Sequence, residues 1–432
     1  MPRLILSFLG IAVSLISLNG LALAAPLPAW VEYGPHGPEL RAVAPAASPC
    51  PTALVDGVTA ATKEGVAGDA DFPKLCRLAL KAGQNVAIGN LRLRAPEAPR
   101  RIIIIGDTGC RLHGASVQPC NDPKGWPFPK IAKIAAAHAP DLVIHVGDYY
   151  YRETPCPITQ PLCAGSPSGD HWLTWRADFF DPAAPLLQTT PFVFVRGNHE
   201  QCHRGGKGWS RLLEPTSPGT PCRDLSPSFF WSWPTLALAT LDSSSAEDRE
   251  VNSRVVEDLK TQLSTIAEAE RTSPNPQQPL FVLTHRPIWA LVPVAQLGPF
   301  GSLDVAINRT LQAAVRGRLP DGTGMVISGH IHHFAAYDFA GARPAQLVAG
   351  EGGDTPEFAD LPRFDRTTGN VDGLRPTRLS FARYGYVLME RQGEAWRIEA
   401  RGLEDEVIAV CTASERRLVC QTPGGAPTKA RR

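Results

Sequence analysis

Oxygen and nitrogen donor side chains occur in five short blocks of the sequence, and each block follows a predicted strand. The blocks are Gly106-Asp107-Thr108-Gly109, Gly147-Asp148-Tyr149-Tyr150-Tyr151, Gly197-Asn198-His199-Glu200, Val282-Leu283-Thr284-His285 and Gly329-His330-Ile331-His332. The candidate metal ligands are Asp107, Asp148, Tyr151, Asn198, His285, His330 and His332. Such donors suit hard or borderline metal ions and require no sulfur ligand. The set therefore indicates a metal site, and a dinuclear site is the most economical interpretation.

Each block taken alone also has a structural interpretation. A Gly-Asp-Thr-Gly segment is usually a turn, and a single histidine such as His285 is more often a hydrogen-bonded core residue. His330 and His332 form a stronger signal, because side chains two positions apart share one face of an extended segment. Only the conjunction of all five blocks favours the metal site.

The blocks require a scaffold that brings strand ends together. Buried strands are predicted from apolar runs at 102–105, 142–146, 192–195, 236–241, 280–283 and 325–327, and helices at 128–138, 247–271 and 302–319. The first two strands and the helix between them form a βαβ unit, so these strands should be parallel. Beyond Phe334 only strands are predicted, which implies two stacked sheets with helices outside. Ligand sites in open α/β sheets lie at the carboxyl ends of strands, where the blocks fall.

These five blocks, in this order, resemble the calcineurin-like metallophosphoesterases, and among them the purple acid phosphatases most closely. The resemblance covers 101 to about 353, and its motifs are highly specific as a set. It implies a four-layer α/β/β/α sandwich. It also implies an acid phosphatase-like hydrolase in which a hydroxide generated at two metal ions attacks the phosphorus of a phosphate monoester.

The resemblance further implies a role for each residue. The broader family has a histidine at the position of Gly109, and here Tyr151 is available to replace it. A tyrosinate favours Fe(III), because a hard anionic oxygen suits a hard cation. The implied ferric ligands are Asp107, Asp148, Tyr151 and His332. The implied ligands of the second ion, which would be Fe(II), Zn(II) or Mn(II), are Asp148, Asn198, His285 and His330.

His199 is the candidate catalytic residue, which would stabilise the phosphate or protonate the leaving alkoxide. Its alternative role is to orient Asn198 or another ligand from outside the metal shell. Glu200 is expected to orient His199. The expected partner is a small phosphorylated substrate. A phosphodiesterase or nucleotidase on the same metal frame, and a non-catalytic phosphate-binding protein, are the two alternatives.

The remaining sequence indicates an exported protein. Residues 1–24 read as a signal peptide, with Arg3, an apolar run and a small-residue cleavage site. Periplasmic or extracellular location, with no stable membrane association after cleavage, is therefore expected. Lys plus Arg number 43 and Asp plus Glu 42, so the net charge of +1 gives no case for a nucleic-acid partner.

The ten cysteines indicate disulfides in an oxidising compartment. Pairing of neighbours along the chain is the hypothesis: Cys50 with Cys76, Cys110 with Cys120, Cys156 with Cys163, Cys202 with Cys222, and Cys411 with Cys420. The predicted domains are a small β-rich module at 25–100, joined through a linker at 93–100 to a catalytic domain at 101–422. A flexible tail is predicted at 423–432.

Overall fold

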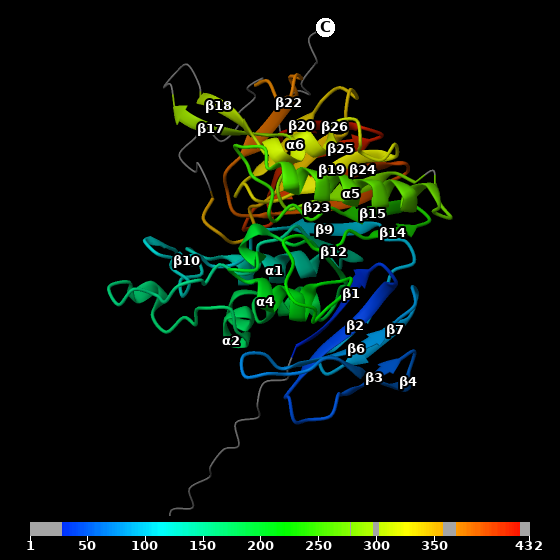
Figure 1. Ribbon diagram of the computed structural model, residues 1–432, viewed down its shortest axis with the longest axis vertical. Coiled ribbons are helices and arrows are strands. Elements are labelled where there is room, and N and C mark those ends of the chain that lie inside the picture. Colours follow the sequence, from blue (N-terminus) through cyan, green and yellow to red (C-terminus); the bar gives the residue numbers. More distant parts are fainter. Residues whose placement is uncertain (1–27, 277, 297–301, 357–368, 424–432) are drawn as a thin grey trace, which may run out of the picture.

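The computed structural model describes residues 28–276, 278–296, 302–356 and 369–423. The predicted signal peptide and nearly all of the predicted tail lie outside these ranges. Figure 1 shows the described chain with the N-terminal strands at one end and the C-terminal strands toward the other.

The first large sheet has eleven strands in the order β26-β25-β24-β23-β9-β12-β13-β1-β2-β6-β5. Its central strands β9, β12 and β13 run parallel to one another, as the predicted βαβ unit requires. Its strands are β1 Ala29–Gly34, β2 Gly37–Ala44, β5 Lys63–Val66, β6 Lys74–Ala79, β9 Arg101–Ile105, β12 Leu142–His145, β13 Phe192–Phe194, β23 Tyr386–Gln392, β24 Ala395–Arg401, β25 Val407–Ser414 and β26 Arg417–Gln421.

The second large sheet has seven strands in the order β14-β15-β16-β19-β21-β20-β22. Strands β15, β16, β19 and β21 are parallel neighbours. Its strands are β14 Phe230–Trp233, β15 Leu236–Thr240, β16 Leu280–Leu283, β19 Thr323–Ser328, β20 Phe334–Asp338, β21 Ala345–Ala349 and β22 Thr377–Phe381.

Three cores separate four layers. One core lies between the sheets, where Ile104 of β9 and Phe281 of β16 belong to the same buried cluster. On the outer side of the first sheet, Ile103 packs with helix α1 (Phe128–Ala137). On the outer side of the second sheet, Ala239 packs with α5 (Ser253–Arg271) and α6 (Arg309–Val315). The alternation of faces along each strand builds the expected α/β/β/α sandwich.

Two predicted helices have different bounds. Helix α5 begins at Ser253 rather than Glu247, because the Asn252 side chain caps it by accepting the N–H of Val255 at 3.2 Å. Val251 therefore lies outside the helix and is 54% exposed. The helix predicted at 302–319 is wrong. Its first part is strand β18 (Ser302–Ile307), paired with β17 (Ala290–Gln296), and α6 starts after Asn308, whose φ of 67° is left-handed.

The N-terminal segment is rich in strands, and they are divided between the first large sheet and a small sheet of their own. Strand β1 pairs in parallel with β13, so β1, β2, β6 and β5 extend the first large sheet. A separate four-stranded sheet consists of β3 Thr52–Val55, β4 Val58–Ala61, β7 Asn85–Ile88 and β8 Leu91–Arg94. Strand β8 thus reaches into the predicted linker at 93–100, and a domain boundary near residue 100 stays a prediction.

The loops are stiffened by disulfides and short helical turns. The predicted cysteine pairing is confirmed at all five positions. The short elements are β10 Leu112–His113, β11 Ser116–Val117, η1 Pro161–Cys163, α2 Trp172–Trp175, η2 Arg176–Phe180, α3 Ala184–Leu187, η3 Asn198–Glu200, α4 Gly206–Gly208 and η4 Trp209–Leu213. Among the described residues, none of the helices has the length and apolar character needed to cross a bilayer.

Candidate metal centre

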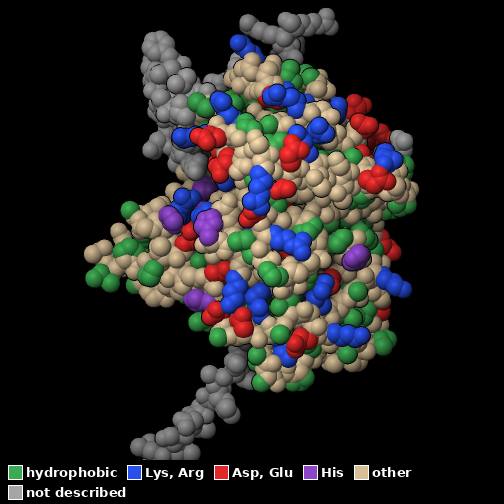
Figure 2. All heavy atoms as spheres, in the orientation of Figure 1, with side chains coloured by type: hydrophobic (Ala, Val, Ile, Leu, Met, Phe, Trp, Pro, Cys, Tyr) green, Lys and Arg blue, Asp and Glu red, His purple; other side chains and the backbone are tan. Residues whose placement is uncertain are grey.

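The five blocks meet where the parallel strands of both sheets end. Strands β9, β12 and β13 of the first sheet lead into the first three blocks, and β16 and β19 of the second sheet lead into the other two. The carboxyl ends of both sheets therefore supply one shared site, as the sequence predicts. On the face shown in Figure 2, histidine side chains gather with basic and acidic ones beside the projecting loops.

Tyr151 lies at the centre of one group of predicted ligands. Its hydroxyl oxygen is 2.8 Å from a carboxylate oxygen of Asp148, 3.0 Å from Nε2 of His332 and 3.3 Å from a carboxylate oxygen of Asp107. All four side chains are buried. The four residues that the resemblance assigns to the ferric ion are thus brought together.

His285 and Asn198 form a second group around Asp148. Nε2 of His285 is 3.2 Å from a carboxylate oxygen of Asp148 and 3.0 Å from Oδ1 of Asn198, while its Nδ1 lies 2.8 Å from the Val146 carbonyl oxygen. Ligand atoms of Asp107, Asp148 and His285 all lie within 4.8 Å of one another, close enough to hold a metal ion. Asp148 stands between the two groups and can serve both.

His330 is placed differently from the other predicted ligands. Its backbone N–H donates to Asp107 at 2.9 Å, and its ring packs against that of His285 with centroids 5.2 Å apart. Its Nε2 faces Asp248 at 3.2 Å and Arg286 at 2.9 Å. His330 thus borders the cluster, and Nδ1 is the ring nitrogen that remains for a ligand.

His199 lies over the ring of Tyr151, with centroids 3.7 Å apart, and its Nε2 is 3.8 Å from a carboxylate oxygen of Asp148. Its Nδ1 is 2.8 Å from a carboxylate oxygen of Glu153, and Arg204 contacts both. The structure therefore gives to Glu153 the orienting role that the sequence analysis assigns to Glu200.

Glu200 binds the backbone instead. Its carboxylate accepts the N–H groups of Asp148, Tyr149, Tyr150 and Gly197 at 2.9–3.1 Å. It therefore fixes the loop that carries Asp148. Glu153 was not predicted from the sequence, because it lies just beyond the second block and no pattern marks it as a partner of His199.

Three further acidic residues beside the predicted ligands were also missed. Asp248 faces His330, Asp354 is 3.4 Å from Nδ1 of His332, and Asp178 accepts the N–H of Tyr151 at 2.7 Å. The segments around these residues have no periodic pattern, so the sequence contains no sign of these contacts. Arg111, which is ion-paired with Asp354, brings a basic group to the same edge.

The buried acidic groups have too few cationic neighbours to stabilise all of their ionised forms. Burial, with the nearby charge of Asp148, raises the pKa of Asp107 well above its usual value. Burial, with the charges of Asp148 and Asp107, likewise raises the pKa of Tyr151. For Asp148 burial acts in the same direction, but His285 and His199 outweigh it and lower the pKa. Added cations would favour the ionised forms of Asp107 and Tyr151.

The backbone at the site is strained. Asp107, Asp148 and His330 adopt left-handed φ values of 55°, 61° and 70°. Non-glycine residues rarely adopt this conformation, and it concentrates at functional sites. Gly109 is required for a related reason, because a Cβ there would lie 2.7 Å from the Tyr151 ring. A side chain at position 109 and the observed position of Tyr151 are therefore mutually exclusive.

The fold and the convergent donors define a metallohydrolase-type site. A family model described as calcineurin-like phosphoesterase matches residues 100–334, more than half of the 432-residue chain. The chain belongs to the calcineurin-like phosphoesterase family, and it is a hydrolase.

Two solved structures resemble the chain in fold. One is purple acid phosphatase PPD1 from yellow lupin (Lupinus luteus), with 14% identity, a TM-score of 0.55 and coverage of 89% of this chain and 74% of that one. The other is PhoD, with 12% identity, a TM-score of 0.57 and coverage of 92% of both chains. A comparison with curated proteins finds no match.

Proposed function

We propose that this protein is an exported, purple acid phosphatase-like enzyme that hydrolyses phosphate monoesters. The observation that carries the proposal is the position of the Tyr151 hydroxyl, within 3.3 Å of Asp107, Asp148 and His332. A phenolate in a set of carboxylate and imidazole donors favours Fe(III). This feature separates the proposed class from relatives that have a histidine in the first block.

The residues fit a pair of metal ions. Two carboxylates and a phenol are buried side by side, and a cation would compensate the charge that burial disfavours. Asp107, Asp148, Tyr151 and His332 would hold Fe(III). Asp148, Asn198, His285 and His330 would hold Fe(II), Zn(II) or Mn(II). When bound, the two ions supply an activated water as nucleophile and stabilise the negative charge that develops on phosphate oxygen.

The protein's own contribution to proton transfer is the pair of His199 and Glu153. A donor bond from Nδ1–H of His199 to Glu153 fixes the ring, and Nε2 then lies between Arg204, at 3.0 Å, and Asp148, at 3.8 Å. Burial is the largest effect on His199 and lowers its pKa, while the charges of Asp148 and Glu153 oppose this shift. Glu153 thus supports the protonated form, from which His199 would donate a proton to the leaving alkoxide. Arg204 holds Glu153 in place through an Nε bond of 3.1 Å.

Hydrogen bonds outside the ligand shell orient the histidine ligands. The Val146 carbonyl oxygen accepts from Nδ1 of His285, which directs Nε2 toward Asp148. The Thr355 carbonyl oxygen lies 3.2 Å from Nδ1 of His332 and does the same for that ring. For His330 the arrangement is reversed. When Nε2–H donates to Asp248, Nδ1 would be left for a metal, whereas Arg286, 2.9 Å from the same Nε2, favours the other tautomer. Such outer contacts fix the tautomer of each ligand.

Export is supported by the disulfides. Five disulfides are typical of proteins that mature outside the cytosol. The predicted signal peptide would direct the chain to the periplasm or the exterior. N-terminal sequencing of the mature protein tests this, and a chain that retains residues 1–24 would contradict it.

Metal analysis with a substrate comparison tests the enzyme. We expect close to two metal ions per chain, visible absorption from tyrosinate-to-iron charge transfer, and faster hydrolysis of 4-nitrophenyl phosphate than of bis(4-nitrophenyl) phosphate. A colourless, manganese-loaded and active protein would leave the hydrolase but remove the tyrosinate–iron centre. Preference for the diester would contradict the monoesterase.

A further inference from the structure

Two buried carboxylates together bind five consecutive backbone amides of the loop that carries Asp148 and Tyr151. Glu200 accepts from the first three, and Asp178 accepts from the last two. The N···O distances to Glu200 are 3.1 Å from Asp148, 2.9 Å from Tyr149 and 3.1 Å from Tyr150, and those to Asp178 are 2.7 Å from Tyr151 and 3.2 Å from Arg152. The N–H groups of the ligand loop are therefore held by side chains, while the carbonyl oxygens of Asp148 and Tyr151 accept from the backbone of Thr108 and Leu112.

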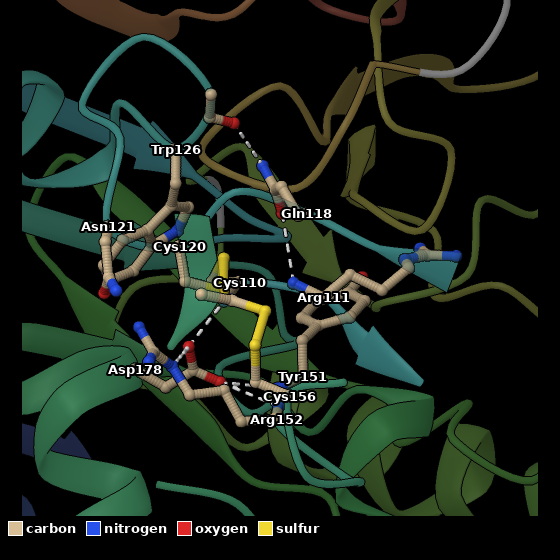
Figure 3. Close-up of a disulfide and its surroundings, with 12 residues drawn as sticks. Cys110, Arg111, Gln118, Cys120, Asn121, Trp126, Tyr151, Arg152, Cys156 and Asp178 are labelled. Carbon is tan, nitrogen blue, oxygen red and sulfur yellow. Dashed lines mark hydrogen bonds and ion pairs between the residues drawn. A yellow bond between two sulfur atoms is a disulfide. The ribbon is translucent and has the colours of Figure 1, made fainter. Parts of the chain in front are cut away.

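Asp178 belongs to none of the five blocks. It lies in η2, within the loop-rich stretch between β12 and β13. Its other carboxylate oxygen accepts the N–H of Cys110 at 2.8 Å and Nε of Arg152 at 2.9 Å, as Figure 3 shows. Since Cys110 follows the first block directly, Asp178 ties the first block to the second.

The surroundings of Asp178 are closed and rigid. The carboxylate is fully buried, and Arg152, its ion-pair partner, is 4% exposed. Arg152 also stacks on Trp126, whose indole N–H donates to the carbonyl oxygen of Thr108 at 2.9 Å. The disulfide from Cys110 to Cys120 closes the loop between them. A buried group with all of its acceptor positions in use defines one geometry rather than several.

We propose that Asp178 is a positioning residue that sets the place of the Tyr151 phenol in the metal centre. This inference rests on the proposed function, because the phenol matters only as a ligand. Asp178 does not touch the reacting atoms. It acts through the backbone of Tyr151, and metal-ligand geometry is sensitive to such supporting contacts, whose loss typically costs about 10–100-fold in metal affinity or activity.

The variant D178N tests this with little change in volume. Each carboxylate oxygen of Asp178 accepts two N–H groups, and an asparagine has only one oxygen. Whichever way the amide turns, its NH₂ group meets N–H donors, either those of Tyr151 and Arg152 or those of Cys110 and Arg152. The hydrogen bonds from one of these two pairs of N–H donors are therefore lost, and the ligand loop must shift.

The matched control is D170N. Asp170 lies in the same stretch and also accepts backbone N–H groups, from Lys207 and Gly208, together with the indole N–H of Trp175 at 2.8 Å. Burial raises the pKa of both aspartates. These hydrogen bonds of Asp170 go to Lys207, Gly208 and Trp175 and not to the ligand loop 148–152, so D170N reports the general cost of an asparagine at a buried acceptor.

The readouts are metal stoichiometry, metal affinity and the tyrosinate absorption of protein loaded with Fe(III) and Zn(II). We expect D178N to bind the ion at the Tyr151 side about 10–100-fold more weakly and to shift or weaken the tyrosinate band, with D170N matching the wild type. If D178N does not fold, the variant R152K is tested in its place. R152K keeps the positive charge but loses the Nε hydrogen bond to Asp178, and we expect smaller changes in metal affinity and in the tyrosinate band.

The outcomes separate the two claims. If the wild type holds two ions with a tyrosinate band, and D178N or its substitute R152K equals D170N in affinity and band, the positioning role is wrong while the proposed function stands. If the wild type binds no metal, or shows no tyrosinate band when it holds iron, the proposed function fails and the inference fails with it.

Discussion

Nδ1 of His199 lies 2.8 Å from a carboxylate oxygen of Glu153, and both side chains are largely buried beside Tyr151. An imidazole in this setting is fixed in orientation, and its Nε2 is directed at the cluster. Despite burial, the contacts with His199 and Arg204 lower the pKa of Glu153 to about 2, so Glu153 remains ionised at any working pH.

Replacing Glu153 with glutamine should slow hydrolysis most for substrates that have poor leaving groups. Without the carboxylate, a smaller fraction of His199 is protonated, and general acid catalysis contributes about 10²–10⁴-fold when the leaving group needs a proton. We expect kcat on phenyl phosphate to fall about 10–100-fold, with a smaller loss on 4-nitrophenyl phosphate. H113A is the control, because exposed His113 contacts the carboxylate oxygen of Glu153 that does not face His199. Equal losses on both substrates would argue against proton donation.

Replacing Tyr151 with phenylalanine should bleach the iron-loaded protein and reduce kcat by at least about 100-fold, as expected for loss of an electrostatic contact to the reacting centre. The measurement is visible absorbance beside kcat. Y150F is the matched control, since Tyr150 is the adjacent buried tyrosine but stacks on Trp175 with centroids 5.9 Å apart. Retained colour in Y151F would remove Tyr151 from the ligand set.

Replacing Asp248 with asparagine should weaken binding of the second metal ion by about 10–100-fold. Asp248 lies 3.2 Å from Nε2 of His330, and an amide can present its NH₂ group to that nitrogen and favour the wrong tautomer. Competition with a chelator measures the affinity. D258N, an exposed change on α5, serves as the control. If D248N binds zinc as the wild type does, His330 is oriented by other means.

The free energy of unfolding should fall as the pH rises, because Glu351 is a buried carboxyl group with a raised pKa. Burial raises the pKa of Glu351 from 4.5 to about 8, and one of its carboxylate oxygens has no hydrogen-bond partner. The folded protein therefore retains a proton that the unfolded chain releases above about pH 4.5. Stability is fully present below that pH, declines up to about pH 8 and is constant beyond it.

The variant E351Q removes this titration. We expect denaturant unfolding at pH 5 and pH 8 to show a decline for the wild type of on the order of a few kcal/mol that E351Q lacks. E394Q, in an exposed turn, should decline like the wild type. Parallel declines in E351Q and the wild type would show that Glu351 ionises freely in the fold.

The strand ends and their donors could be predicted because they are local features. An apolar run followed by glycine and a donor, such as Ile102 to Asp107, specifies both the strand and the exit of the chain. The acidic partners could not be predicted, because the contact of Asp248 with His330 joins loops 82 residues apart. No short-range pattern encodes such a contact.

The errors in the fold have the same cause. Ile307, Leu311 and Val315 recur every four residues and imitate one helix face across the true boundary at Asn308. Residues 302–307 form a strand because they pair with β17, and the helical pattern does not reveal this pairing. The pairing of Glu32 in β1 with Phe192 in β13 is likewise non-local, so the N-terminal segment could not be assigned to the large sheet.

The order of strands in the first sheet bears on how the chain matures. Strand β13 has β1 as its outer neighbour, and β9 has β23, which begins at Tyr386. A nascent chain lacks β23 until Tyr386 and the residues after it have been synthesised, so the edge of β9 stays open up to that point. Closure of that edge, and with it the final placement of Asp107 just beyond β9, therefore waits for a strand that lies far along the chain.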